Sequence, residues 1–414
     1  MKRYTTLMKK PITPMFLFVF VVLSSACRSV APETSEQRLG RARRLARETL
    51  IVDGHIDVPY RLQRRRDDVS RATDGGDFDY PRAVEGGLDA PFMSIYVPAS
   101  LEADGGSKAL ADHLIDLVEE IATDAPEKFG VAHSTTDVKK CFDQGRVALL
   151  LGMENGSPIE GDLANLEHFY RRGIRYITLC HSKDNHICDS SYDGRHSAKG
   201  LTAFGRQVVD RMNELGVIID VSHISDDTFW QVMERTRAPV LATHSSMRHF
   251  TPGFERNMSD EMVRKMGETG SVVMINFGSA FISDAFRLYR ETRSEAVADF
   301  CDAKGVERDS EEAKAYIEAY NEENPLPFAD VADVADHIDH VVQLVGIDHV
   351  GLGSDFDGVG DSLPTGLKDV SEYPNLIAEL MRRGYSDDDL RKICSGNAMR
   401  VLAAVERVAA QSTP

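Results

Sequence analysis

Residues 49–59 read TLIVDGHIDVP, an apolar run followed by two candidate metal ligands, His55 and Asp57. On an extended segment, side chains two residues apart point to the same side, so this pair can chelate one ion. The same letters also describe a polar turn that closes a strand, because Asp57 stands two residues before Pro59. Ligands elsewhere in the chain therefore decide whether the pair belongs to a metal site.

Apolar runs of the same kind recur through the chain, each followed by a polar tip and a segment with helical periodicity. After the first run at 49–53, they cover residues 92–97, 147–152, 174–179, 217–221, 239–243, 271–277 and 349–354. Near-continuous apolar runs of this length are typical of strands buried on both faces of a parallel sheet. Eight strands alternating with helices predict an α/β fold, a (β/α)8 TIM-like barrel, rather than an open doubly wound sheet. No G-x-G-x-x-G motif follows an early strand, which argues against a dinucleotide-binding domain.

Two of the intervening segments carry clear helix start signals. The segment 225–236 begins with Ser225 followed by two acidic residues, and the segment 259–270 begins with Ser259. A serine hydroxyl at this position accepts a hydrogen bond from a free backbone amide of the first turn. Both segments are therefore predicted to be capped helices.

The N-terminus has the anatomy of an export signal over residues 1–26. Basic residues precede an apolar run from Met15 to Leu23, and small residues stand before Cys27. That run is too short to span a bilayer as a stop-transfer helix. The string LSSAC resembles a bacterial lipoprotein cleavage box with lipidation at Cys27, although Ser24 stands where the pattern prefers Leu. We predict a periplasm-facing lipoprotein of the bacterial cell envelope; a simply cleaved signal and an anchor helix are the alternatives.

The rest of the chain is predicted to be one domain behind a tether. Residues 27–46 are polar and basic and are predicted to form the tether, and residues 47–412 are predicted to form a single catalytic barrel domain. The charged helical segment at about 280–330 is predicted to be an insertion between the last two strands.

Composition excludes several classes of function. The formal charge is −18 and the basic residues form no stripe beyond short patches at 43–47 and 61–66, so a nucleic-acid partner is not expected. Beyond Cys27 there are five cysteines at irregular spacing, which is neither a disulfide framework nor a zinc knuckle. At most one disulfide bridge is compatible with this pattern.

The polar tips carry a constellation of candidate ligands. Six of the eight runs are followed by His, Asp or Glu: these residues are His55, Asp57, Glu154, His181, His223, His244 and Asp355. Taken singly, each is also a common structural residue at the end of a strand. Four of the chain's 13 histidines, however, follow four different runs. Because active sites of such barrels lie at the carboxyl ends of the strands, the set predicts a metal site there.

The residue types favour two metal ions. His55 and Asp57 can hold one ion, His223 and His244 from neighbouring strands a second, and Glu154 can bridge them. Ligation by imidazole and carboxylate alone suits two Zn²⁺, with Mn²⁺ or Co²⁺ as alternatives. Asp355 is then left to orient water and carry its proton, which makes it a catalytic candidate. His181 can polarise the scissile carbonyl or stabilise the tetrahedral intermediate.

The sequence resembles the membrane (renal) dipeptidase family of zinc dipeptidases, peptidase family M19, whose members have amidohydrolase-like barrels. The matching strings are DGHIDVP, GMENG, RYITLCHS, VIIDVSHIS, VLATHSS, DHIDHVVQLVGIDHVGLGSDFDGV and ICSGNAMRVL, spread over about residues 49–402. The resemblance implies a metallo-dipeptidase that hydrolyses dipeptides, including those with a C-terminal D-residue, and that can form a homodimer. It assigns the five metal ligands and Asp355 as above, and makes His181 a substrate-binding histidine.

The resemblance also implies an arginine that holds the substrate's free carboxylate. Arg256 stands in the expected Arg-Asn context, although its spacing from His244 is about one residue longer than the family pattern. Arg248 is the alternative that lies nearer to His244 in the sequence. A bidentate arginine suits a terminal carboxylate. Two other functions remain open: another amide or lactone hydrolase on the same barrel, and a non-catalytic peptide-binding lipoprotein. The His-x-Asp pair at the first strand argues against the former, and the complete ligand set against the latter.

Overall fold

The computed structural model describes residues 1–11 and 33–412. The chain divides into two units, Met1–Thr34 and Ser35–Pro414, and all helices and strands of the described residues belong to the second. The apolar part of the predicted export signal and Cys27 lie outside the described residues. Across the described ranges, no helix has the length and apolar character needed to cross a membrane.

Nine parallel strands form the centre of the second unit. They are β1 (Val52–Ile56), β2 (Ala90–Tyr96), β3 (Phe129–Val131), β4 (Val147–Glu154), β5 (Ile174–Thr178), β6 (Ile218–Asp220), β7 (Leu241–Ala242), β8 (Val272–Ile275) and β9 (Val350–Leu352). Pairings β1–β9 and β2–β4 close eight of them into a barrel, which confirms the predicted (β/α)8 fold. The eight correspond to the eight apolar runs. β3 was not predicted; it pairs with the first half of β4, below the point where β4 joins β2.

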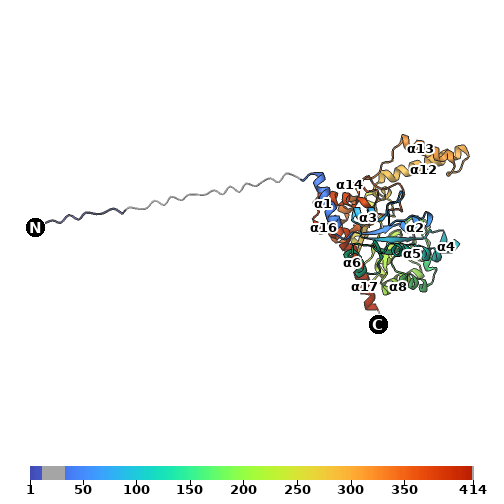
Figure 1. The fold of residues 1–414 in the computed structure, drawn as a ribbon, viewed down its shortest axis with the longest axis horizontal. Coiled ribbons are helices and arrows are strands. Elements are labelled where there is room, and N and C mark those ends of the chain that lie inside the picture. Colours follow the sequence, from blue (N-terminus) through green and yellow to red (C-terminus); the bar gives the residue numbers. More distant parts are fainter. Residues whose placement is uncertain (12–32, 413–414) are drawn as a thin grey trace. The chain divides into compact units, whose positions relative to one another are not determined.

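Helices surround the barrel (Figure 1). The α-helices are α1 (Ser35–Glu48), α2 (Val58–Arg64), α3 (Tyr80–Gly86), α4 (Leu101–Asp104), α5 (Ser107–Asp124), α6 (Thr135–Asp143), α7 (Leu163–Arg171), α8 (Ala203–Leu215), α9 (Asp226–Arg235), α10 (Asp260–Glu268), α11 (Ser279–Ile282), α12 (Asp284–Lys304), α13 (Glu311–Glu323), α14 (Val331–Val345), α15 (Tyr373–Arg383), α16 (Asp387–Arg391) and α17 (Asn397–Ser412). Shorter helical turns are η1 (Ser157–Ile159), η2 (Arg248–Phe250), η3 (Ile347–His349), η4 (Val370–Glu372) and η5 (Lys392–Gly396). Ser225 and Ser259 cap α9 and α10 through their hydroxyls, as predicted.

Alternation along the buried strands separates the barrel interior from the layer under the helices. On β4, Ala148 and Leu150 belong to one apolar cluster, whereas Leu149 and Leu151 belong to another. Because successive side chains of a strand point to opposite faces, one set fills the barrel and the other packs against helices. Both faces of β4 are therefore apolar, which explains its continuous apolar run.

Two helical parts lie at the periphery of the second unit. α1 includes residues 35–46, which were predicted to form part of the tether, and it buries Ala42, Leu45 and Ala46. α12 and α13 project from the second unit between β8 and β9 (Figure 1). They have a small apolar cluster of their own, built on Val297, Cys301 and Ala313.

Candidate metal centre

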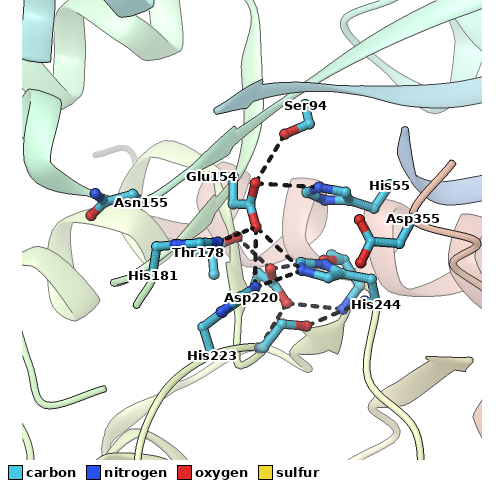
Figure 2. A network of polar contacts seen from close by, with 12 residues as sticks. His55, Ser94, Glu154, Asn155, Thr178, His181, Asp220, His223, His244 and Asp355 are labelled. Atoms are coloured by element: carbon cyan, nitrogen blue, oxygen red, sulfur yellow. Dashed lines mark hydrogen bonds and ion pairs between the residues drawn. The ribbon is translucent and has the colours of Figure 1, made fainter. Parts of the chain in front are cut away.

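The seven predicted site residues meet at one end of the barrel. Figure 2 labels all of them except Asp57. His55 lies in β1, Glu154 ends β4, and the others follow directly behind their strands: these are Asp57, His181, His223, His244 and Asp355. Each comes from the carboxyl end of a parallel strand, and the barrel brings those ends together. The extended backbone expected through Asp57 ends at Ile56, because Asp57 is already the N-cap of α2. His55 Nε2 and Asp57 Oδ2 are nevertheless 3.3 Å apart.

Glu154 lies at the centre and presents its two oxygens to different partners. Its Oε2 is 3.4 Å from His55 Nε2, on the side of Asp57. Its Oε1 is 3.1 Å from His223 Nε2, 3.4 Å from His244 Nε2 and 3.5 Å from His181 Nε2. One carboxylate thus separates two groups of donors, as a bridging ligand does.

The donor atoms are arranged in a way that a cation would satisfy. His223 Nε2 and His244 Nε2 face each other at 2.9 Å, and His55 Nε2 and Asp57 Oδ1 are buried without a hydrogen-bond partner. Donors converge within 4.8 Å in the sets His55–Glu154–His244, Glu154–His181–His223 and His55–Asp57–Asp355. Buried polar atoms rarely remain unpaired, so these residues fit metal ions held by nitrogen and oxygen.

Hydrogen bonds behind His244 and His55 hold the metal-facing nitrogens of these two histidines in place. Asp220 accepts bonds from the Thr243 hydroxyl (2.8 Å) and the Thr178 hydroxyl (2.5 Å). Because the Thr243 hydroxyl donates to Asp220, it accepts from His244 Nδ1 at 2.8 Å, which leaves His244 Nε2 with its lone pair. His55 Nδ1 likewise forms a hydrogen bond with the Tyr176 hydroxyl at 2.8 Å, on the side of the ring away from the centre.

Two further supporting residues were not assigned a role from the sequence. Asp53, buried in β1, accepts hydrogen bonds from the amides of His55 and Ser354 and from the Tyr373 hydroxyl. It thereby ties the tip of β1 to the tip of β9. Asn276, directly after β8, donates from Nδ2 to Asp355 Oδ2 at 2.7 Å. That bond fixes the carboxylate of Asp355.

The backbone is strained at two of these tips. His223 and Asp355 have φ angles of 69° and 63°, in the left-handed region that residues with a Cβ rarely adopt. Such conformations cost about 1–3 kcal/mol each and persist where the surroundings enforce them. The fold thus gives up stability to aim both side chains at the centre.

Burial and charge set the protonation of the site. Burial opposes the charged form of Glu154, yet His55, His181, His223 and His244 together hold its pKa well below the ordinary value. Burial, assisted by Arg256, lowers the pKa of His223 and His244, so both are neutral ligands at pH 7. Burial and the neighbouring carboxylates raise the pKa of Asp355 well above its ordinary value. A bound dication would favour the ionised form of Asp355.

His181 is the most exposed histidine of the centre. Its side chain is 21% exposed, against 6% for His223 and 1% for His244. Its ring packs edge-on against Tyr96, and burial lowers its pKa, so it is neutral at pH 7. The position suits a group that contacts a ligand in the cavity.

The two candidate arginines have different surroundings. Arg248 binds both oxygens of Asp226 and two backbone carbonyls, so its guanidinium is held firmly by Asp226 and the neighbouring backbone. Arg256 is buried beside the centre, donates to Ser245 Oγ and the His244 carbonyl, and keeps an unpartnered Nε. Arg256 therefore has several donors left beside the metal centre, whereas most donors of Arg248 are used.

The loop that carries Arg256 is anchored by a buried histidine. His337 of α14 accepts the Met247 amide at Nδ1 (2.9 Å) and contacts the Ile282 carbonyl through Nε2 (3.0 Å). The neutral imidazole satisfies both contacts. Burial lowers the pKa of His337 from 6.5 to about 4.

We expect His337 to make stability depend on pH. Its folded pKa lies below its unfolded pKa, so its contribution is complete above about pH 6.5 and is lost as pH falls through about pH 4, by about 3 kcal/mol in all. Urea unfolding of metal-free protein between pH 7.5 and 4 will measure this, because acid also releases metal. The difference in free energy of unfolding between the wild-type protein and His337→Gln should shrink as the pH falls from 7.5 to 4. A difference that stays constant would contradict the prediction.

Gly358 leaves room for the carboxylates of the centre. A Cβ at this position would stand 2.2 Å from Asp57 Oδ2 and 2.3 Å from Asp355 Oδ1. We expect Gly358→Ala to displace both and to lower metal affinity by about 10–100-fold, as changes behind metal ligands do. Gly360→Ala is the control for a loop glycine, because no heavy atom lies near its added Cβ, although its φ of 58° adds local strain. Metal titration will compare the affinities of the two variants. Equal affinities would show that the carboxylates of Asp57 and Asp355 can shift without loss of metal binding.

The centre opens into a cavity of about 660 Å³. Its lining residues are Asp57, Tyr60, Arg64, Tyr96, Glu154, His181, Ser182, Lys183, Tyr192, His223, Phe281, Arg290, Asp355, Asp357, Gly358, Val359 and Ser362. This volume lies within the range of small-molecule sites, about 300–1,000 Å³. A parallel barrel with four histidines and three carboxylates at the carboxyl ends of its strands is typical of metal-dependent hydrolases.

Comparison with known proteins agrees with this class. The sequence model described as membrane dipeptidase (peptidase family M19) matches residues 39–413. The dipeptidase ataJ of Aspergillus terreus is 31% identical, over 90% of this chain and 88% of its own. The crystal structure of the probable dipeptidase PvdM from Pseudomonas aeruginosa has a TM-score of 0.76 at 27% identity and covers 90% of this chain and 100% of its own.

A further neighbour was solved with a ligand. The metallopeptidase from Rhodobacter sphaeroides, liganded with a phosphinate mimic of the dipeptide L-Ala-D-Ala, has a TM-score of 0.70 at 26% identity. The match covers 86% of this chain and 99% of that one. This chain belongs to the membrane dipeptidase family, peptidase family M19. It is therefore a metallopeptidase with dipeptidase relatives.

Proposed function

We propose that this protein is a binuclear zinc dipeptidase that hydrolyses the amide bond of dipeptides, including those with a C-terminal D-residue. The observation that carries the proposal is Glu154, whose two oxygens face two separate donor groups. His55 and Asp57 would hold one ion, His223 and His244 the other, and Glu154 both. Nitrogen and oxygen donors suit Zn²⁺, with Mn²⁺ or Co²⁺ as substitutes. The L-Ala-D-Ala mimic in the Rhodobacter sphaeroides relative supports the D-residue.

The residues around the centre divide the chemistry among them. Two bound ions would supply Lewis-acid activation of water and of the scissile carbonyl. Asp355 accepts a proton from the water molecule while the water oxygen attacks the carbonyl carbon. It then delivers this proton to the amide nitrogen as the C–N bond breaks. Asn276 occupies Oδ2 of Asp355, which leaves Oδ1 for this proton.

Two other side chains bind the substrate. His181, neutral and partly exposed, contacts the scissile carbonyl and stabilises its developing negative charge. Arg256 holds the C-terminal carboxylate, for which its unpartnered Nε leaves donor capacity. A clamp on the free carboxylate places the peptide bond next to the C-terminus at the metal centre.

Metal removal followed by a substrate panel tests the proposal. Chelated protein should lose hydrolysis of L-Ala-L-Ala and L-Ala-D-Ala, and two equivalents of Zn²⁺ per chain should restore both. Lactones and phosphotriesters should remain unhydrolysed. Activity on those compounds without dipeptide hydrolysis would instead favour another hydrolase on this barrel.

We also propose that the protein acts in the bacterial cell envelope, held by a lipid on Cys27. The signal anatomy of residues 1–26 and the LSSAC string support this location. Cys27→Ser should shift the protein from the membrane fraction to the soluble fraction. Unchanged fractionation would contradict the lipid anchor.

A further inference from the structure

Three basic side chains line the mouth of the cavity: Arg64 at the end of α2, Lys183 behind β5 and Arg290 on α12. All three residues are exposed. Across residues 1–11 and 33–412, none of them forms an ion pair. The chain has a formal charge of −18, and Arg287 on the same helix pairs with both Asp284 and Glu291. Unpaired cations therefore gather at the cavity although carboxylates are abundant elsewhere.

The acidic residues of the cavity are already committed. Asp57, Glu154 and Asp355 converge on the metal centre, where bound dications would balance them. Asp357 pairs with Arg61 at 3.1 Å. The three cations thus face no uncommitted carboxylate inside the cavity. Fixed charge of one sign at a cleft raises the local concentration of ligands of the opposite sign.

One side of the cavity joins these cations to Arg256. The Arg256 guanidinium lies 5.3 Å from the ring of Phe281, and Phe281 and Arg290 both come from the segment between β8 and β9. Phe281, Arg290 and Tyr192 all line the same cavity. Arg290 stands on the side where the proposed function puts the substrate's C-terminal carboxylate.

We propose that the cavity selects dipeptides whose C-terminal residue carries an acidic side chain. Arg256 binds the main-chain carboxylate, and Arg290, with Lys183 and Arg64, attracts the second carboxylate. The insertion between β8 and β9 thereby contributes to specificity through Arg290. The inference rests on the proposed dipeptidase function and adds the substrate class.

Matched substrates measure this preference directly. L-Ala-L-Glu and L-Ala-L-Gln have nearly the same shape and differ in one charge, as do L-Ala-D-Glu and L-Ala-D-Gln. For at least one pair, the glutamate substrate should have a kcat/KM about tenfold higher at low ionic strength. The ratio should approach one at about 0.5 M salt, because exposed charges are screened. Equal kcat/KM values at low salt would overturn the inference.

Variants assign the preference to the cations. Arg290→Gln should lower the Glu/Gln ratio of kcat/KM values about threefold. Arg293→Gln is the matched control on α12, because Arg293 bonds Asn321 and does not line the cavity. The triple change of Arg64, Lys183 and Arg290 to Gln should bring the ratio to about one. A ratio unchanged in the triple variant would overturn the assignment.

Equilibrium binding separates this inference from the proposed function. Zinc-loaded Asp355→Asn protein, titrated calorimetrically with L-Ala-L-Glu and L-Ala-L-Gln and with the corresponding D-pair, should bind the glutamate dipeptide of the preferred pair more tightly. Equal Kd values would overturn the inference. If zinc-loaded wild-type protein hydrolyses no dipeptide at all, the proposed function fails instead. Hydrolysis of neutral and acidic dipeptides at equal rates defeats only the charge preference.

Discussion

Replacing Glu154 by Gln is expected to remove both metal ions and to lower kcat/KM by at least about a thousandfold. The Glu154 side chain is 5% exposed, and its oxygens lie 3.1–3.5 Å from four imidazole nitrogens. An amide of the same shape has one neutral oxygen, and its NH₂ group cannot bind a cation. The bridge between the two donor groups is lost with the charge. Elemental analysis of the purified variant and dipeptide turnover measure the two effects.

The matched control is Glu160→Gln. Glu160 is exposed, follows η1 six residues beyond Glu154, and bonds the Lys108 amide rather than a histidine. It should retain two equivalents of zinc and wild-type turnover. Circular dichroism of both variants shows whether the barrel remains folded. A folded Glu154→Gln protein with two zinc ions and normal activity would contradict the assignment of Glu154 as bridge.

The sequence was sufficient to predict the barrel and the convergence of the candidate ligands because both depend on local patterns. Continuous apolar runs mark buried parallel strands, and their carboxyl ends must meet at one side of the barrel. His223 and His244 could therefore be placed together without knowledge of any loop. Even the wrong expectation of extended backbone at Asp57 left its proximity to His55 correct, because the turn into α2 keeps the carboxylate near the tip.

The supporting residues could not be predicted because their partners are distant in the chain. Asp53 stands beside His55, yet its role depends on Ser354 and Tyr373, which are 301 and 320 residues away. Asn276 likewise becomes meaningful only when Asp355, 79 residues later, comes within 2.7 Å. No local pattern specifies such pairs.

The residues that line the cavity could not be predicted from the sequence either. Arg290 lies in a charged helical insertion whose composition predicts only an exposed surface. Its place at the cavity depends on how α11 and α12 leave β8, which no spacing rule gives. Short β3 was missed for a similar reason: its three residues form a strand by pairing with the first three residues of β4.

Replacing Asp355 by Asn is expected to retain both metal ions and to lower kcat by about 10²–10⁴-fold, the usual contribution of a general acid–base group. The amide oxygen of the substituted side chain can still accept the Asn276 hydrogen bond, so the geometry of the tip of β9 is preserved. What is lost is the ability to accept a proton from water and to deliver it to the leaving amine. Metal content and kcat should therefore separate, whereas in Glu154→Gln they fall together.

Two measurements make the Asp355 prediction decisive. KM for L-Ala-L-Ala should change little, because Arg256 and His181 still bind the substrate. Asp361→Asn, an exposed carboxylate of the same loop, is the control and should behave like wild type. Loss of zinc from Asp355→Asn would make Asp355 a ligand, which its convergence with His55 and Asp57 within 4.8 Å also permits. Retained zinc with normal kcat would exclude Asp355 from proton transfer and leave the two metal ions to act with another base.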